Sequence, residues 1–177
     1  MAKPLVFDST PLIYLTRVSL SKYFNSISAE KFATQTVFDE VVQEGKKKEA
    51  PEASLLERLF DEHIINVRKA KENEFLKFVK EMAAETQRQP LHEAEAEVLC
   101  LAKELNGVAI ADDKAVRTVA GLLGIETHGT AYILGKIYTA KKITKEELSR
   151  KVREMHELGW RLSAEDYFKI TAYLNSL

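Results

Sequence analysis

Short apolar runs alternate with longer helical patterns along most of this chain. Five runs read as strands, namely residues 4–7, 31–34, 64–67, 108–111 and 125–127. Each is too short for a helix and is bounded by polar or turn-forming residues. Strands that alternate with helices form a parallel sheet with right-handed crossovers. The sequence therefore predicts an α/β fold, a three-layer α/β/α sandwich around a mostly parallel sheet of four to five strands.

The pattern changes after Gly129, beyond which the chain is helical. Residues 144–147 (Thr-Lys-Glu-Glu) have the form of a capping box that starts a helix. Gly159 is expected to end this helix, and Ser163 to begin the last one. We therefore expect an α/β domain over residues 1–130 and a C-terminal helical hairpin over residues 131–177, packed on the same domain.

Two local features of the α/β part give further expectations about its helices. Thr10 is expected to cap the first helix, with Pro11 at the first helical position. A second helix over residues 36–44 is expected to end at Gly45, and another is expected over residues 72–88.

Composition restricts the class of protein. The 177 residues are 45% hydrophobic and 30% charged, as is usual for a globular domain, and a net charge of −1 argues against a general polyanion binder. No apolar run approaches the ~20 residues of a membrane span. Asp8 interrupts the first apolar run, so no signal peptide is expected. The single Cys100 leaves no internal disulfide and fits a cytoplasmic location.

Acidic residues stand at four places beside these predicted strands and helices. They are Asp8, Glu40, the alternating Glu93, Glu95 and Glu97, and the pair Asp112 and Asp113. Ligands of an open α/β sheet bind at the carboxyl ends of its strands. Clustered carboxylates repel one another unless a cation is present, and oxygen ligands suit Mg²⁺ or Mn²⁺. The arrangement predicts a metal-dependent enzyme that acts on phosphates.

Each acid alone has an ordinary explanation. Asp8 could form a turn, Asp113 could cap a helix, and Glu40 could lie exposed on an amphipathic helix. Together the four places fit hydrolysis of a phosphodiester. Two divalent ions ~4 Å apart stabilise the attacking and the leaving oxygen, and holding them requires several carboxylates from different elements.

Four sequence motifs accompany the acids. They occupy residues 6–13 (VFDSTPLI), 35–41 (QTVFDEV), 95–102 (EAEVLCLA) and 110–117 (IADDKAVR), and Gly129-Thr130 follows the last strand. In this order they resemble the PIN-domain ribonucleases, most closely a branch similar to the toxins of type II toxin–antitoxin pairs. The resemblance covers nearly the whole chain. Ala94 stands where this branch usually has glycine, so the third acid is Glu95, which we prefer, or Glu97.

The resemblance implies a role for each motif. The carboxylates that would hold Mg²⁺ or Mn²⁺ and serve catalysis are Asp8, Glu40, Glu95 and Asp113, with Asp112 assisting. Ser9 or Thr10 would hydrogen-bond a phosphate oxygen or a water. Arg117 would contact the scissile phosphate or, as we prefer, pair with an acid. A metal-activated water would cleave RNA and leave a 5′-phosphate and a 3′-hydroxyl.

The resemblance also implies partners, namely RNA as substrate, a second copy in a homodimer, and a small antitoxin protein. Two alternatives stay open. A haloacid-dehalogenase-type phosphatase also begins with a strand and an Asp, but it has a second Asp two residues later, where this chain has Thr10. A PIN-like fold kept only for binding is the other, since fold alone does not secure activity.

Other reactive side chains are not expected to carry chemistry. The four histidines lack zinc-like spacing, and only His92 lies near an acidic helix start. Cys100 is expected to be a buried thiol. The aromatic residues of the C-terminal part are expected to pack rather than to stack on RNA bases; they are Trp160, Tyr167, Phe168 and Tyr173.

Overall fold

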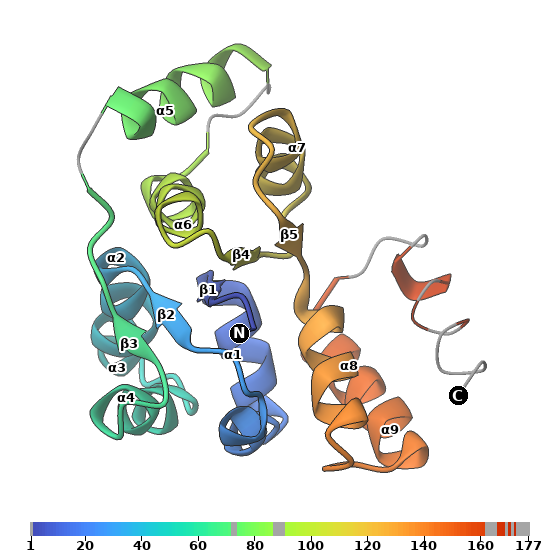
Figure 1. The fold of residues 1–177 in the computed structure, drawn as a ribbon. Coiled ribbons are helices and arrows are strands. Elements are labelled where there is room, and N and C mark those ends of the chain that lie inside the picture. The colour runs from blue at the N-terminus through green and yellow to red at the C-terminus, as the bar shows by residue number, and fades with distance from the viewer. Residues whose placement is uncertain are drawn as a thin grey trace.

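The structure, a computed structural model, describes residues 2–71, 74–86, 91–161, 166–168, 170 and 172 (Figure 1). Its sheet has five strands in the order β3-β2-β1-β4-β5, and all four pairings are parallel. The strands are β1 (Leu5–Phe7), β2 (Lys31–Ala33), β3 (Asn66–Val67), β4 (Val108–Ile110) and β5 (Thr127–His128). The predicted parallel sheet of four to five strands is confirmed.

Strand β1 lies at the centre of the sheet, and the chain builds outward from it in both directions. Every residue of β1 and β4 is buried, as expected for parallel strands that are covered on both faces. Phe7 pairs with Ala33 on one side and with Ile110 on the other. The strand order reverses between β1 and β4, and such a switch point opens a crevice at the carboxyl ends of the strands.

Helices cover both faces of this sheet, so the predicted three-layer arrangement is confirmed (Figure 1). On one face lie α6 (Glu93–Glu104) and α7 (Lys114–Leu122), with α5 (Glu74–Thr86) packed against both. On the other lie α1 (Ser9–Arg17), α8 (Thr130–Thr139) and α9 (Lys145–Glu157). The remaining helical segments are η1 (Ser21–Ser26), α2 (Gln35–Phe38), η2 (Asp39–Glu44), α3 (Gly45–Lys47) and α4 (Ala53–Asp61).

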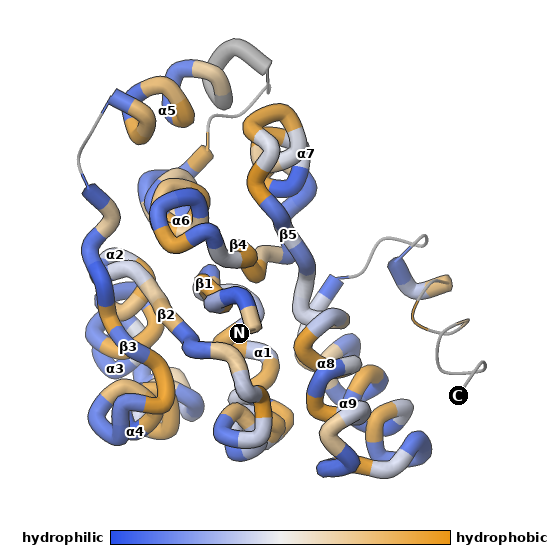
Figure 2. Tube along the Cα trace, viewed as in Figure 1, coloured by the Kyte–Doolittle hydropathy of each residue, from blue (hydrophilic) through white to orange (hydrophobic). Residues whose placement is uncertain are grey.

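One hydrophobic core joins the sheet to its helical layers. Hydrophobic and hydrophilic stretches alternate along the helices in Figure 2, which is the pattern of helices with one buried face. Phe7 of β1 stacks on Phe24 of η1 with ring centroids 5.5 Å apart, and both rings are fully buried. Trp160, which follows α9, is also buried, with 1% of its surface exposed. The C-terminal helices are therefore part of the same core.

The structure corrects two expected helix boundaries. Helix α1 begins at Ser9 with Asp8 as its N-cap residue, so Thr10 lies inside the helix and is not its cap. Gly45 does not end its helix, because its φ of −57° is helical and the chain continues into α3. A Cβ atom at Gly45 would lie only 3.1 Å from the Cβ of Ala53, so this glycine permits close packing with α4.

The C-terminal helices follow the predicted pattern up to residue 161. Thr144 caps α9 by accepting a hydrogen bond from the backbone N–H of Glu147. Gly159, with a φ of +97°, follows the end of α9, where such a conformation favours glycine. The expected helix start at Ser163 and the aromatic Tyr173 lie outside the described residues, as do both ends of the helix expected over residues 72–88. The division of the chain at residue 130 stays a prediction.

Within the described ranges, the structure contains no helix with the length and apolar character needed to cross a bilayer.

Candidate active site

The carboxyl edge of the sheet, where the paired strands β1 and β4 end, brings the first and the fourth motif together. The backbone N–H of Asp8 donates to the carbonyl of Ile110 at 2.9 Å, which extends the pairing of the two strands by one step. Asp8 and the pair Asp112 and Asp113 therefore leave the sheet side by side at its carboxyl edge. This is the location that the strand pattern predicts for a ligand site.

Asp8 is the buried acid at this edge of the sheet, with 7% of its surface exposed. Burial is the largest cause that raises the pKa of its carboxyl from 3.8 to about 7. A hydrogen bond from the backbone N–H of Ser9 lowers this pKa, whereas the negative charges of Glu95, Glu40 and Asp112 raise it. Three acids from distant parts of the chain thus act on one buried carboxyl, as the sequence predicts for a clustered site.

Glu40 reaches this cluster from a helix of unusual geometry. It lies in η2 (Asp39–Glu44), a π-helical segment between α2 and α3, and π-helical turns occur often at functional sites. The hydroxyl of Ser9 donates to Glu40 Oε2 at 2.7 Å. Ser9 is buried while Glu40 is exposed. The Ser9 hydroxyl therefore links the buried side of the acidic cluster to the exposed Glu40 carboxylate. Thr10, the other candidate hydroxyl, is half-buried in the first turn of α1.

The two candidates for the third acid point to different surroundings. Glu95 is half-buried and accepts a hydrogen bond from the backbone N–H of His92 at 2.7 Å. Burial raises the pKa of Glu95, and the charges of Asp113 and Glu40 raise it as well. The charge of Glu97 acts instead on Cys100, in the same helix. The structure therefore places Glu95 in the field of Asp113 and Glu40.

Asp113 serves as the N-cap residue of α7. Its Oδ1 atom accepts from the backbone N–H groups of Ala115 at 2.6 Å and Val116 at 3.2 Å. Capping is the ordinary role of an acid that precedes a helix, and it is compatible with a ligand role because a carboxylate has a second oxygen. Asp113 is exposed, and its charge acts on Glu95 across the crevice.

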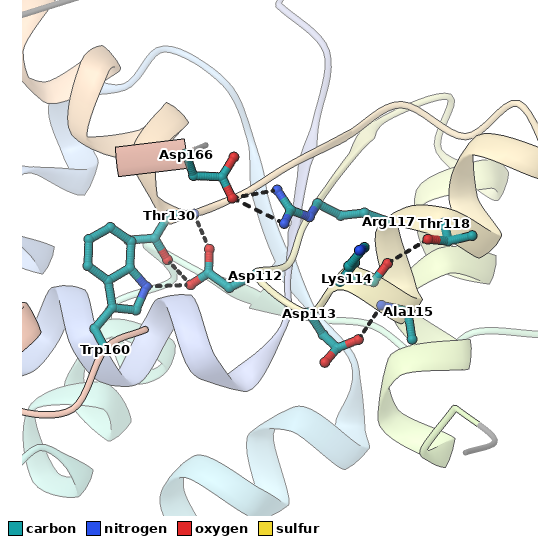
Figure 3. A network of polar contacts seen from close by, with 9 residues as sticks. All are labelled: Asp112, Asp113, Lys114, Ala115, Arg117, Thr118, Thr130, Trp160 and Asp166. Carbon is teal, nitrogen blue, oxygen red and sulfur yellow. Dashed lines mark hydrogen bonds and ion pairs between the residues drawn. The ribbon is translucent and has the colours of Figure 1, made fainter. Parts of the chain in front are cut away.

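Asp112 is held by three donors from the C-terminal half of the chain (Figure 3). Its Oδ1 atom accepts from the backbone N–H of Thr130 at 2.7 Å. Its Oδ2 atom accepts from the Thr130 hydroxyl at 2.6 Å and from the indole N–H of Trp160 at 2.8 Å. A Cβ atom at Gly129 would lie 2.7 Å from Asp112 Oδ1, so glycine is required for this close approach.

Arg117 pairs with an acid of the C-terminal segment, which is the role that we preferred for it. Its Nη1 and Nη2 atoms lie 3.3 Å and 3.2 Å from Asp166 Oδ2 (Figure 3). About a third of the Arg117 side chain is exposed, so this ion pair is only partly buried.

Sequence reasoning missed the structural roles of Thr130, Trp160 and Asp166 at this site. Gly129-Thr130 after the last strand was the one available signal, since a glycine and a hydroxyl at a strand end suit a close polar contact. Trp160 and Asp166 carry no local signal, because their partners lie 48 and 49 residues earlier.

The chemistry of this donor set fits Mg²⁺ or Mn²⁺, since every candidate ligand is a carboxylate or hydroxyl oxygen. Asp8 is surrounded by like charges that raise its pKa, and a divalent cation would relieve this repulsion. Among the described residues, however, no three acidic, histidine or cysteine side chains stand close enough to hold one ion as they are placed. Binding an ion would therefore require these side chains to draw together.

Other reactive residues agree with the sequence analysis. Cys100 is buried, and burial raises the pKa of its thiol to about 12, so it is neutral near pH 7 and cannot act as a thiolate. Trp160 packs in the core, as predicted, and cannot stack on a base. The expectation that Tyr167 and Phe168 pack is wrong, because 55% and 71% of their surfaces are exposed.

Comparison with known proteins agrees with this fold. The PIN domain family matches residues 4–176, and the chain is therefore a member of the PIN domain family. Its fold is also similar to the crystal structure of PAE2754 from Pyrobaculum aerophilum, with a TM-score of 0.55 and 14% sequence identity, over 78% of this chain and 99% of that one. A search of curated proteins gives no match. The predicted family is confirmed, and the PIN domain family is therefore preferred over the phosphatase alternative.

Proposed function

We propose that this protein is a divalent-metal-dependent ribonuclease, and the toxin component of a toxin–antitoxin pair. The observation that carries the proposal is the buried Asp8 at the switch point of the sheet. Its carboxyl lies in the field of acids from three other segments, Glu40, Glu95 and Asp112. Membership in the PIN domain family supports nuclease chemistry in general.

In this proposal four acids hold the ions, Asp8, Glu40, Glu95 and Asp113, and the chain itself orients three of them. Ser9 directs the Glu40 carboxylate by donating to one of its oxygens. The N–H of His92 fixes Glu95, and the first turn of α7 fixes Asp113. When bound, Mg²⁺ or Mn²⁺ would supply activation of water and neutralisation of the leaving oxygen.

Two residues of the fourth motif have different roles in this proposal. Asp112 assists indirectly, because both of its oxygens already accept hydrogen bonds from Thr130 or Trp160. Arg117 stands near the crevice but is neutralised by Asp166, so contact with a phosphate would have to share or displace this ion pair.

A second candidate function is a binding module without turnover. Its support is that no three candidate ligands stand close enough for one ion within the described part of the chain. The ion pair of Arg117 with Asp166 and the three hydrogen bonds to Asp112 also point this way, since they use polar groups that substrate or metal would need.

Partners and location extend the proposal. A homodimer and a small antitoxin protein are supported by large exposed apolar side chains, namely Phe78, Leu122, Tyr167 and Phe168. Light scattering over a range of concentrations tests the dimer, and a monomer at every concentration would overturn it. The cytoplasmic location stays a prediction.

The deciding experiment is cleavage of an end-labelled RNA with unpaired loops, in Mn²⁺ and in chelator. Wild type is compared with Asp8→Asn, which keeps the shape of the side chain and removes its charge. Asp61→Asn is the matched control, because it makes the same change at an exposed position at the end of α4.

The ribonuclease proposal expects cleavage by wild type and Asp61→Asn in Mn²⁺, none in chelator, and none by folded Asp8→Asn. Equal cleavage by Asp8→Asn would show that the acids do not serve catalysis. An inert wild type that still binds the RNA would favour the binding module.

A further inference from the structure

A pair of stacked rings lies on the edge strand β5 and the helix that follows it, and it has no part in the proposed chemistry. The rings of His128 and Tyr132 are nearly parallel, with an angle of 9° and centroids 4.1 Å apart. His128 is the last residue of β5, and Tyr132 is in the first turn of α8. The two ring-bearing elements meet at the carboxyl edge of the sheet.

The backbone ties this ring pair to the acidic motif. His128 pairs with Ile110 of β4, and its carbonyl accepts from the N–H of Ala111 at 2.9 Å. Two residues after His128, Thr130 donates to Asp112. The ring pair therefore starts on the strand next to the one that delivers Asp112 and Asp113.

The surroundings of the rings suit a nucleotide. The His128 side chain is 40% exposed, while Tyr132 backs its ring from behind. The ammonium of Lys136 lies 4.6 Å from the centroid of the Tyr132 ring. The carboxylate of Glu126 contacts the same ring: its Oε1 atom lies 3.3 Å from His128 Nε2, while its Oε2 atom pairs with Lys3 at 2.7 Å. A flat ring on a rigid backing next to a cation is the arrangement that binds an unpaired base and its phosphate.

We propose that the outer face of the His128 ring, supported by Tyr132, is a subsite that stacks one unpaired RNA base, and that Lys136 binds the phosphate beside that base. The subsite rests on the proposed function for its choice of RNA as ligand, and it goes further because it assigns where one unpaired base is held. It also predicts that duplex RNA, whose bases are already stacked, binds more weakly.

Binding is measured by fluorescence anisotropy with a labelled single-stranded RNA, in the Asp8→Asn background so that the RNA stays intact. His128→Ala is expected to weaken binding roughly tenfold, because stacking on an aromatic ring contributes that much or more per base. His128→Phe keeps a flat ring and should restore the affinity. Tyr138→Ala is the matched control, since it removes a tyrosine at the far end of the same helix α8.

An abasic scan separates stacking from a general loss of structure. One nucleotide at a time is replaced by an abasic one, and a single position is expected to weaken binding to the His128 protein roughly tenfold. The same replacement should have no further effect on His128→Ala. Lys136→Met should lower the salt dependence of binding by about 0.7 in log–log slope, the value for one phosphate of a single strand.

The subsite would be overturned if the abasic position and His128→Ala weakened RNA binding independently of each other. It would also be overturned if no abasic position weakened binding. These results are distinct from failure of the proposed function, which is read from cleavage by the protein that retains Asp8. If the protein cuts RNA but no abasic position changes the affinity, only the subsite is wrong. If an RNA base stacks on His128 but the RNA is never cut, only the ribonuclease proposal is wrong.

Discussion

Trp160 donates its indole N–H to Asp112 at 2.8 Å, although 48 residues separate the two in the chain. The indole is buried, and the carboxylate stands at the end of β4 beside the candidate active site. Thr130 holds the same carboxylate with two further hydrogen bonds. The C-terminal helices are therefore attached to the acidic motif itself, and the stability of one should depend on the other.

A double-mutant cycle tests this attachment. Asp112→Asn and Trp160→Phe are each expected to destabilise the protein, and their combination should cost less than the sum of the two. The expected coupling is about 2 kcal/mol, the usual size for a buried hydrogen bond to a charged group. Urea unfolding of the four proteins gives the free energies. The exposed pair Arg58 and Glu62 provides a control cycle whose coupling should be near zero. Additive effects at Asp112 and Trp160 would contradict the attachment.

Gly129 gives a second prediction, from sterics alone. Its φ of −93° suits any residue, so only the contact of a new Cβ atom with Asp112 Oδ1 at 2.7 Å opposes Gly129→Ala. We expect a loss of about 1–3 kcal/mol, typical of overpacking. Gly121→Ala is the matched control, because a Cβ atom there meets no atom within 4 Å and the position is helical. It should stabilise by up to ~1 kcal/mol. Equal thermal shifts for the two variants would contradict this account.

The sequence was sufficient for the fold because its strands are short, apolar and separated by helices. Residues 5–7 and 108–110 are buried in the sheet as their composition predicts. Boundaries were harder, since a helix can begin one or two residues earlier without changing its apolar face. Asp8, rather than Thr10, precedes α1 for this reason. The π-helical turn that carries Glu40 has no signal in local composition.

The candidate site was predictable in its acids but not in their partners. Helical spacing showed that Glu95 and Glu97 point in different directions, but the rotation of α6 about its axis comes from packing. The sequence also showed that Arg117 could pair with an acid, yet Asp166 could not be selected because it lies 49 residues away. Contacts across such distances depend on the assembled fold.

The third acid gives a prediction from a matched pair of substitutions on one helix. Glu95→Gln should lower Mn²⁺-dependent cleavage by a factor of about 10 to 100. Substitution of a residue that only orients a metal ligand already has an effect of this size. Glu97→Gln should retain cleavage, because the charge of Glu97 acts on Cys100 and is not among the charges that raise the pKa of Asp8 or of Glu95. Initial rates and Mn²⁺ titration by calorimetry provide the comparison. Loss in Glu97→Gln with retention in Glu95→Gln would reverse the assignment.

Asp8 predicts how stability depends on pH in the absence of divalent metal. Its pKa is about 7 in the folded protein and near 3.8 when unfolded. Between these values the folded state keeps a proton that the unfolded state has released, so the contribution of Asp8 to stability falls as pH rises from 4 to 7 and is then constant. The full shift corresponds to at most about 4 kcal/mol.

Relative to wild type, Asp8→Asn should therefore gain stability in chelator as pH rises, while Asp61→Asn follows wild type. Urea unfolding at pH 4 and pH 8 measures the gain, and parallel pH profiles for wild type and Asp8→Asn would show that Asp8 is not a buried acid of raised pKa.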